Sequence, residues 1–345
     1  MNGFDVAVVA PDRQVIASIT DLVDRVSAER DHAALGEHKR MELDHLAAGP
    51  GAGPGRAGPM AMVVARQDGR PVGYAHLSAT PAAQDYAVEL VVDAGAGPGI
   101  SPSDGPPSDD RMSPPAAATT GGRRVADALL RTAVDHVAAE GGGMLRLWVP
   151  RATAADEALA TAHGFELERE LIQMRCPLPR PTGLVPRGTP VQTRPFRPGV
   201  DEEAWVAVNN RAFGDHPEQG HWDLATVLER EQEPWFDPEG FLLMESEGHL
   251  VGSCWTKVHS TTIPPLGEIY VIGVDPDYHG RGWGRALTAA GLDWLAARGL
   301  AVGMLYVDAD NRPAVSLYRS MGFEPDHVDR AYRRAVAVGL GPSDA

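Results

Sequence analysis

The sequence predicts an α/β fold in which one domain, a mixed twisted sheet flanked by helices, occurs twice in tandem. Three observations support this prediction. The order of strand-like and helix-like segments repeats along the 345 residues, a proline-rich stretch separates the two copies, and the length suits two domains better than one.

The repeat can be followed segment by segment. Each copy has a turn and then a strand that starts with Val-Gly, in DGRPVGYAHL (68–77) and EGHLVGSCWT (247–256). A second strand follows in each, ELVVDAG (89–95) and YVIGVDP (270–276). An amphipathic helix, a glycine stop, a buried strand, a short helix, a Gly-Phe turn and a closing strand complete both copies.

The domain boundaries follow from this repeat. We expect a first domain over residues 1–178, a linker over 179–190 and a second domain over 191–345. The offset between matched glycines falls from 179 to 158 residues, so the first copy carries an insertion. The insertion falls in a Gly/Pro/Ser/Ala-rich stretch, 94–122, which we expect to be a disordered loop.

Composition narrows the choice of partners. A formal net charge of −16 argues against nucleic acid or an anionic membrane as the main partner. The sequence contains no long apolar run and starts without the pattern of a signal peptide, so we expect a cytoplasmic protein. We also expect a monomer. Cys176 and Cys254 lie far apart without metal-type spacing, and we expect no metal.

One turn predicts an anion site. The stretch VDPDYHGRGWGRAL (274–287) is typical of a strand that enters a helix through a glycine-rich turn, where backbone N–H groups meet the positive end of the helix dipole. Glycine allows a phosphate to approach the backbone closely. The same pattern can simply reverse the chain. It is no Walker loop, and its late position argues against a dinucleotide fingerprint.

The order of this turn and the segment after it resembles the GNAT superfamily of N-acetyltransferases. In that family the turn cradles the pyrophosphate of acetyl-CoA, and an Asn-x-x-Ala-x-x-x-Tyr-x-x-x-Gly-Phe segment completes the site. Here the segment is filled by Asn311, Ala314, Tyr318, Gly322 and Phe323. His279 stands where the family usually has Gln or Arg, which leaves the backbone contacts unaffected.

The resemblance implies a set of residues that hold acetyl-CoA. They are Ile272, Gly273, Val274, His279, Gly280, Arg281, Gly282, Trp283, Gly284, Arg285, Asn311, Arg312, Pro313, Ala314, Val315 and Ser316. Backbone N–H groups near Ile272–Val274 would hold the thioester carbonyl and the pantetheine arm.

Two residues are candidates for the chemistry. The resemblance makes Glu268 the general base, and strand alternation from it places Tyr270 and Ile272 on its face; the alternative is an edge carboxylate in solvent. Tyr318 lies two helical turns after Asn311, on the same side, and would give a proton to the departing thiolate. Its alternative is a tyrosine that merely packs on the Gly-Phe turn.

Longer motifs are similar to tandem GNAT enzymes that acetylate the cysteinyl amine of a glucosaminyl-inositol. They include HPEQG (216–220), WTKVH (255–259) and ELIQMR (170–175). The resemblance implies a substrate site made of Glu37, Glu218, Lys257, Glu268 and Tyr306. We expect Glu37 to bring the first half into contact with the substrate. Taken alone, each of these residues would be a solvated surface group.

The first half lacks the corresponding chemistry. Counting back from Val92 as the partner of Val274 places Tyr86 opposite Glu268, and counting from Gly164 places Ala160 opposite Tyr318. Catalysis is therefore expected in the second half, while a second CoA site at Leu90, Val91 and Val92 remains open. Two other functions also remain: acetylation of another small amine, such as an aminoglycoside, and non-catalytic sensing of acyl-CoA.

Overall fold

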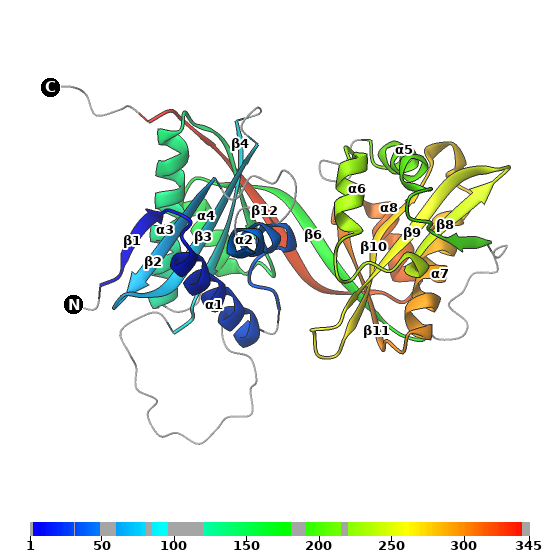
Figure 1. Cartoon of the computed structure of the whole chain (residues 1–345), viewed down its shortest axis with the longest axis horizontal. Coiled ribbons are helices and arrows are strands. Elements are labelled where there is room, and N and C mark those ends of the chain that lie inside the picture. The colour runs from blue at the N-terminus through cyan, green and yellow to red at the C-terminus, as the bar shows by residue number, and fades with distance from the viewer. Residues whose placement is uncertain are drawn as a thin grey trace, which may run out of the picture. The chain divides into compact units, whose positions relative to one another are not determined.

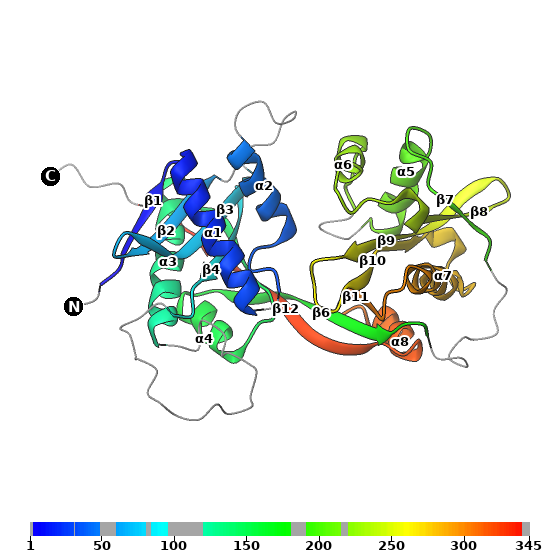
Figure 2. The same cartoon turned by 60° about the horizontal axis from the view of Figure 1, so that its bottom comes forward.

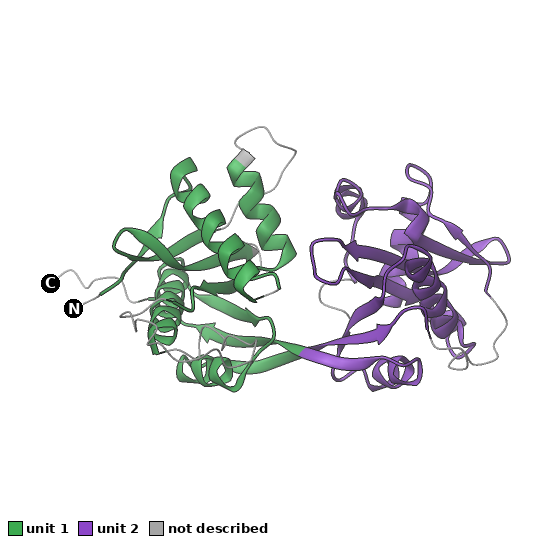
Figure 3. Cartoon of the chain, turned by 90° about the horizontal axis from the view of Figure 1, so that it is seen from below, with its two compact units in different colours: residues 1–170, 328–345 green, residues 171–327 purple. Residues whose placement is uncertain are grey.

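A computed structural model describes most of the chain, and it divides the chain into two compact units (Figure 3). The described residues are 3–30, 32–48, 60–80, 84–95, 120–180, 191–214 and 220–339. Unit 1 consists of residues 1–170 and 328–345, and unit 2 of residues 171–327. The expected linker and loop lie largely outside the described residues, but 120–122 are helical rather than part of a loop.

Unit 1 is a sheet with helices on both faces (Figure 1). Its elements are β1 (Asp5–Val9), α1 (Arg13–Arg30), α2 (Glu37–Ala48), β2 (Ala61–Gln67), β3 (Arg70–Thr80), β4 (Asp85–Val92), α3 (Thr120–Ala139), β5 (Gly143–Val149) and α4 (Ala154–Ala162). The strand order is β1-β2-β3-β4-β5, with β4 and β5 parallel and the other pairs antiparallel. Apolar side chains of α1 and α2 pack on one face, and those of α3 and α4 on the other.

Unit 2 repeats this arrangement (Figure 2). Its elements are β7 (Thr193–Pro195), α5 (Glu202–Ala212), α6 (Leu224–Arg230), β8 (Phe241–Ser246), β9 (His249–His259), β10 (Leu266–Val274), α7 (Trp283–Ala297), β11 (Val302–Asp308) and α8 (Arg312–Ser320), with short 3-10 turns at Pro238–Gly240 and Pro276–Tyr278. The strand order is β7-β8-β9-β10-β11, and β10 and β11 are the parallel pair. Helices α5 and α6 lie on one face and α7 and α8 on the other.

The closing strand of each sequence half completes the sheet of the other unit. Strand β6 (Glu166–Pro177) belongs to the first half, yet its residues 171–177 pair with β11 of unit 2. Strand β12 (Glu324–Val336) belongs to the second half, yet its residues 330–336 pair with β5 of unit 1. The compact units therefore divide inside these two strands, whereas the repeat in the sequence divides the chain near residue 178.

Local sequence explains the two helices that border the site. Helix α7 starts after Gly282, which has a φ of +77°, a backbone conformation that residues with a side chain rarely adopt. The helix buries Leu287, Leu292 and Leu295. Asn311 caps the start of helix α8: its side chain accepts a hydrogen bond from the N–H of Ala314 at 3.2 Å, and proline occupies the first turn of the helix. Both helix starts therefore follow from residues in the motifs.

Within the described part of the chain, no helix combines the length and the hydropathy that crossing a bilayer needs.

Candidate active site

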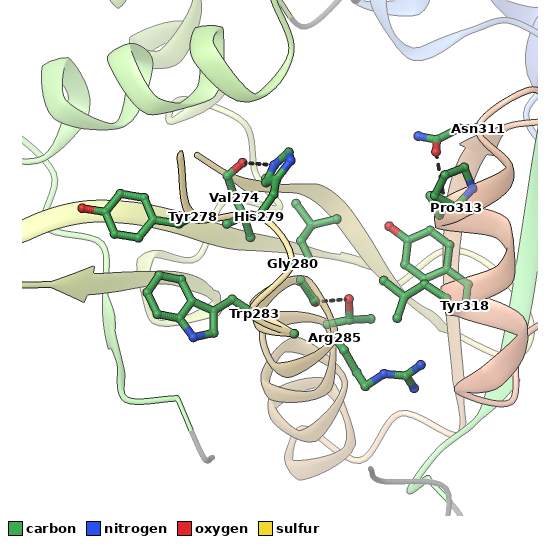
Figure 4. A pocket seen from close by; sticks show the side chains of 16 residues that line it. Val274, Tyr278, His279, Gly280, Trp283, Arg285, Asn311, Pro313 and Tyr318 are labelled. Carbon is green, nitrogen blue, oxygen red and sulfur yellow. Dashed lines mark hydrogen bonds between the residues drawn. The ribbon is translucent and has the colours of Figure 1, made fainter. Parts of the chain in front are cut away.

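Unit 2 holds a pocket of about 460 Å³ between the end of β10, the turn into α7 and the start of α8 (Figure 4). Its lining comes from these three segments: Ile272, Gly273, Val274, Tyr278, His279, Gly280, Gly282, Trp283, Gly284, Arg285, Thr288, Asn311, Pro313, Ala314, Leu317 and Tyr318. Figure 4 shows the residues of the turn on one side of the pocket and Asn311, Pro313 and Tyr318 on the other.

The structure brings most of the predicted acetyl-CoA residues together around this pocket. The exceptions are Arg281, Arg312, Val315 and Ser316. The guanidinium of Arg281 lies over the rings of Tyr278 and Trp283, at 4.9 and 5.2 Å from their centroids. Val315 is buried in the core beneath α8. The four residues do not line the pocket, although their backbones belong to the same two segments.

Three lining residues, Tyr278, Thr288 and Leu317, were missed by the sequence interpretation. Thr288 lies one helical turn after Gly284 and donates a hydrogen bond to its carbonyl oxygen at 2.8 Å. Leu317 lies one turn after Ala314. The helical spacing would have found both, because residues three or four apart share a face. Tyr278 is stacked on Trp283, a contact between side chains that the sequence does not reveal.

The turn has the shape that its glycines predict. Gly280 and Gly282 both have a φ of +77°, and no atom lies within 4 Å of a Cβ added at either of them or at Gly284. The residue before α7 offers no side-chain cap, so the first N–H groups of that helix are left to a ligand or to water. His279 closes the turn, since its Nε2 lies 2.8 Å from the carbonyl oxygen of Val274.

Tyr318 both packs and lines the pocket. Its ring meets Phe323 of the Gly-Phe turn edge-on, with centroids 5.8 Å apart, and its side chain is 8% exposed. Burial raises the pKa of this phenol above its ordinary value. The hydroxyl therefore carries its proton throughout the neutral range and is a hydrogen-bond donor there.

Glu268 lies in β10 and is buried, with 7% of its surface exposed. Lys257 is its neighbour across the β9–β10 ladder. Oε2 of Glu268 lies 2.7 Å from Nε2 of His259, a residue for which the sequence predicted no role. Because Lys257 and His259 are two residues apart on one strand, the hairpin register would have placed both beside Glu268.

A β-bulge overturns part of the expected strand geometry. The β9–β10 register shifts between Ile269 and Val271, so Tyr270 is an extra residue in its strand. Tyr270 remains on the face of Glu268, where Lys257 lies 5.3 Å from its ring, whereas Ile272 packs on the opposite face with the core under α7. The prediction that Ile272 shares the face of Glu268 was therefore wrong.

The two candidate catalytic residues lie on opposite faces of the sheet. Glu268 lies on the face of α5 and α6, and Tyr318 packs with the core on the face of α7 and α8. The β10–β11 ladder ends at the pair Ile269 and Leu305, and from Val271 onward β10 pairs with β9 alone. An extended ligand that enters where this ladder ends can reach both faces.

The other predicted substrate residues occupy different surroundings. Lys257 is buried, with Nζ 4.4 Å from the ring centroid of Trp235. The hydroxyl of Tyr306 accepts a hydrogen bond from Nε2 of Gln173 at 2.7 Å, so the ELIQMR strand positions it. Glu37 is exposed at the start of α2 in unit 1. Glu218 lies outside the described residues.

Unit 1 differs at each matched position. With Tyr270 treated as the extra residue, the ladders align Glu268 with Ala87, not with Tyr86 as counted along the sequence. Ala160, opposite Tyr318, is fully buried. The side chains of Val91 and Val92 are also buried in the two cores of unit 1, so only their backbone could serve the second CoA site considered above. Among the described residues, no three His, Cys, Asp or Glu side chains gather as metal ligands would.

Comparisons with known proteins place the chain in a family. Residues 204–323 match the acetyltransferase (GNAT) family. The chain is 42% identical over 287 residues to mycothiol acetyltransferase of Acidothermus cellulolyticus, with 79% of each chain covered. It is 39% identical over 326 residues to that of Streptomyces coelicolor, with 93% of this chain and 91% of the relative covered.

Solved structures agree on the fold. A GCN5-related N-acetyltransferase from Sphaerobacter thermophilus superposes with a TM-score of 0.62 at 22% identity, covering 99% of this chain and 98% of the other. A tandem GNAT protein of clavulanic acid biosynthesis gives the same TM-score at 18% identity, covering 99% of this chain and all of the other. The expected tandem GNAT fold is thereby confirmed. The chain belongs to the mycothiol acetyltransferases of the GNAT family.

Proposed function

We propose that this protein transfers the acetyl group of acetyl-CoA to the cysteinyl amine of a glucosaminyl-inositol, and that the product is mycothiol. The observation that carries the proposal is the end of the β10–β11 ladder, which lies between Glu268 on one face and the pocket with Tyr318 on the other. The relatives from Acidothermus cellulolyticus and Streptomyces coelicolor both carry the name mycothiol acetyltransferase, which supports this proposal.

The pocket in unit 2 suits the phosphates and the pantetheine arm of acetyl-CoA. Gly280, Gly282 and Gly284 leave open space above the turn, and the uncapped start of α7 offers backbone N–H groups to an anion. Along Val271–Val274, no strand among the described residues pairs with the edge of β10 that faces away from β9, so its peptide groups can pair with the amides of pantetheine. Acetyl-CoA supplies an activated acetyl group as a thioester.

Glu268 and Tyr318 divide the two proton transfers. The Glu268 carboxylate takes a proton from the acceptor ammonium and passes it to solvent, and the neutral nitrogen then forms the new bond to the acetyl carbon. In the tetrahedral intermediate this nitrogen is again positively charged, and it loses its second proton through Glu268 to solvent. As the carbon–sulfur bond breaks, the sulfur leaves with its electron pair, and the Tyr318 hydroxyl donates a proton to it. The phenol regains its proton from solvent. One proton is thus released for each ammonium group that is acetylated.

The acceptor is held by polar groups on the face of Glu268. Lys257 next to Glu268, and Tyr306 held by Gln173, offer an ammonium and a phenol to a polyhydroxylated substrate. We assign Glu37 and Glu218 to the same substrate on the strength of the resemblance alone. The rings around Lys257 bury its stem and restrict its motion, so that the ammonium is already placed when the substrate arrives.

A direct assay tests the proposal. Purified full-length protein is incubated with acetyl-CoA and a panel of amines that includes the cysteinyl-glucosaminyl-inositol, glucosaminyl-inositol without cysteine, free cysteine and aminoglycosides. Release of CoA and formation of the N-acetyl product are measured together. We expect kcat/KM to be highest for the cysteinyl compound. A higher value for an aminoglycoside would favour the other acetyltransferase function, and binding of acetyl-CoA without CoA release on any amine would favour a sensor.

A further inference from the structure

The β9–β10 hairpin places His259 beside the buried carboxylate of Glu268. His259 is the last residue of β9 and pairs with Leu266, the first residue of β10. The loop between them is tied to the strand, because Oγ1 of Thr262 donates a hydrogen bond to the carbonyl oxygen of His259 at 3.0 Å. The backbone that carries the imidazole is therefore fixed at the same strand pair that carries the carboxylate.

The contact itself is short and one-sided. Nε2 of His259 lies 2.7 Å from Oε2 of Glu268, and the other carboxylate oxygen has no part in it. The side chain of Glu268 is 9% exposed and that of His259 is 26% exposed. An ionised carboxylate can only accept a hydrogen bond, and the Nε2–H tautomer of the imidazole is the one that donates to it. The hydrogen bond also holds the carboxylate in one rotamer.

A general base must be aimed as well as ionised. An unrestrained Glu side chain samples several rotamers, and only one of them brings an oxygen to the amine. A hydrogen bond on Oε2 selects that rotamer and leaves Oε1 to accept the proton. The same arrangement, in which one group orients the base and the base serves the reacting atom, recurs in catalytic triads.

We propose that His259 is a positioning residue for catalysis: it donates a hydrogen bond from Nε2 to Oε2 of Glu268 and so directs Oε1 to the acceptor amine. This inference rests on the proposed function, because it takes Glu268 as the base. It adds a residue to which the resemblance assigns no role. Lys257, on the same strand face, contributes a positive charge beside Glu268, whereas His259 contributes the directed hydrogen bond.

Three substitutions of His259 distinguish a hydrogen bond that orients Glu268 from a side chain that only packs. His259→Leu removes the donor and should lower kcat about 10-fold or more, the effect of losing a hydrogen bond to a charged group, with KM for acetyl-CoA unchanged. His259→Gln can place an N–H where Nε2 was and should stay within about 3-fold of the wild type. His259→Asn is too short to reach Oε2 and should resemble Leu. His249→Leu, at the exposed start of the same strand, is the matched control.

A double-mutant cycle decides whether His259 acts through Glu268. In the Glu268→Gln background, His259→Leu should cause no further loss of kcat, because the group that it directs is gone. Independent losses that multiply would overturn the proposal, and so would wild-type kcat in His259→Leu. If His259→Leu does not fold, as a thermal melt would show, the Gln and Asn variants give the answer: equal kcat in both contradicts the proposal.

The cycle is run with whichever amine the wild-type protein acetylates fastest. If that amine is not the cysteinyl-glucosaminyl-inositol, the proposed acceptor fails while the role of His259 is still decided by the cycle. If the cysteinyl compound is the best acceptor and the cycle is additive, the proposed function stands and the positioning role fails.

Discussion

The two units share a backbone arrangement, but the same face of the sheet carries a buried polar cluster in unit 1 and an aromatic cluster in unit 2. In unit 1, His76 of β3 is fully buried between two partners: the Tyr74 hydroxyl lies 2.8 Å from Nδ1, and Oε2 of Glu42 lies 2.7 Å from Nε2. Trp255 occupies the matching position in unit 2. His76 pairs with Glu89, three residues before the end of β4, and Trp255 pairs with Val271, three residues before the end of β10. Trp255 is stacked on Phe241 and surrounded by further aromatic rings.

The polar face of unit 1 holds helix α2. Lys39 of α2 donates to Oγ of Ser78 at 3.0 Å, and Glu89 of β4 accepts the N–H of Gly36 at 2.6 Å, immediately before Glu37. A Cβ on Gly36 would lie 2.8 Å from Oε1 of Glu89, so a side chain there would force the carboxylate to shift. The polar cluster thus fixes the helix start that carries Glu37.

The comparison shows what a duplicated fold keeps and what it can lose. Both units keep one parallel strand pair, and in both the parallel ladder stops before the end of the inner strand, at Glu89 in unit 1 and at Ile269 in unit 2. Unit 2 adds a bulge in its inner strand, a carboxylate (Glu268) where unit 1 has Ala87, and a glycine turn. Backbone geometry survives because it determines folding, whereas the groups needed for chemistry persist only where they are used.

The largest effect is expected from replacing the carboxylate on the inner strand of unit 2, compared with a carboxylate on the inner strand of unit 1. Glu268→Gln in β10 should lower kcat by about 10²–10⁴-fold, the usual loss for a general base, with little change in the affinity for acetyl-CoA. The loss should shrink at high pH, where the amine is already neutral. The matched control is Asp85→Asn in β4 of unit 1, a partly exposed carboxylate paired with Arg146. The test is kcat measured by steady-state kinetics at pH 7. If Glu268→Gln has the kcat of the wild type, Glu268 is not the general base.

Tyr318→Phe tests the second difference, since its counterpart Ala160 has no hydroxyl. We expect kcat to fall by about 10²-fold, near the lower end for general acids, because a thiolate is already a good leaving group. KM for acetyl-CoA should not change, as the ring still packs on Phe323. Single-turnover kinetics separate the chemical step from binding. An effect confined to KM would return Tyr318 to a packing or binding role.

The glycine turn, which unit 1 lacks, can be tested at a position without backbone strain. Gly284 is in the first turn of α7, with an ordinary φ and open space above it, so Gly284→Val should fold yet obstruct the phosphates. Loss of one charge-assisted hydrogen bond would weaken acetyl-CoA binding about 10- to 150-fold. Calorimetry measures the affinity directly. Gly299→Val, at a φ of +82° after the same helix, controls for general destabilisation. Unchanged affinity in a folded Gly284→Val protein would mean that the turn only reverses the chain.

Glu37 tests whether unit 1 contributes to substrate binding at all. Because this carboxylate is exposed, water competes with its hydrogen bonds, and we expect Glu37→Ala to raise KM for the acceptor about 10-fold, the lower end for a charge-assisted contact. KM for acetyl-CoA should stay constant. Glu29→Ala, an exposed carboxylate near the end of α1, serves as the control. Wild-type kinetics in Glu37→Ala would leave the polar cluster of unit 1 with a structural role alone.

The smallest expected effect is a difference in how the units respond to acid. Hydrogen bonds from His38 and His76 outweigh burial and hold the pKa of Glu42 at about 2, and burial lowers the pKa of His76. The unfolded chain therefore binds more protons at both groups, and unit 1 loses stability as the pH falls below about 6.5. In unit 2, burial and the neighbouring Glu202 raise the pKa of Glu231 to about 7. The folded state binds the extra proton there, so the contribution of this group to the stability of unit 2 is complete below about pH 4.5 and is lost as the pH rises from there through about 7.

Hydrogen exchange can resolve the two responses. Between pH 7.5 and pH 5.5, after correction for intrinsic rates, peptides from β3 should lose protection while peptides from β9 keep or gain it. A change of about 1 kcal/mol in the free energy of unfolding would move the melting temperature of a domain of this size by about 2–4 °C. His76→Phe should remove the pH dependence of unit 1, and equal responses of β3 and β9 would contradict the assignment.

The sequence by itself determined the tandem α/β plan, the glycine turn and the segment from Asn311 to Phe323, because each depends on local patterns. Strand alternation, helical spacing and the demand for glycine at positive φ act over a few residues, and the repeat made them visible twice. Helical spacing placed Tyr318 on the same side of its helix as Asn311, whereas the resemblance to the GNAT family singled out Glu268 for the chemistry. Thr288 and Leu317 were also within reach of helical spacing.

Only the tertiary structure decided how these pieces combine. The exchange of β6 and β12 between units depends on pairing between strands more than 100 residues apart, which no local pattern encodes. The bulge at Tyr270 shifted the register, and with it the face of Ile272 and the counterpart of Glu268, because one extra residue inverts every later side chain. The contact of His259 with Glu268 likewise exists only once the hairpin has closed, since the chain brings them together through the pairing of β9 with β10.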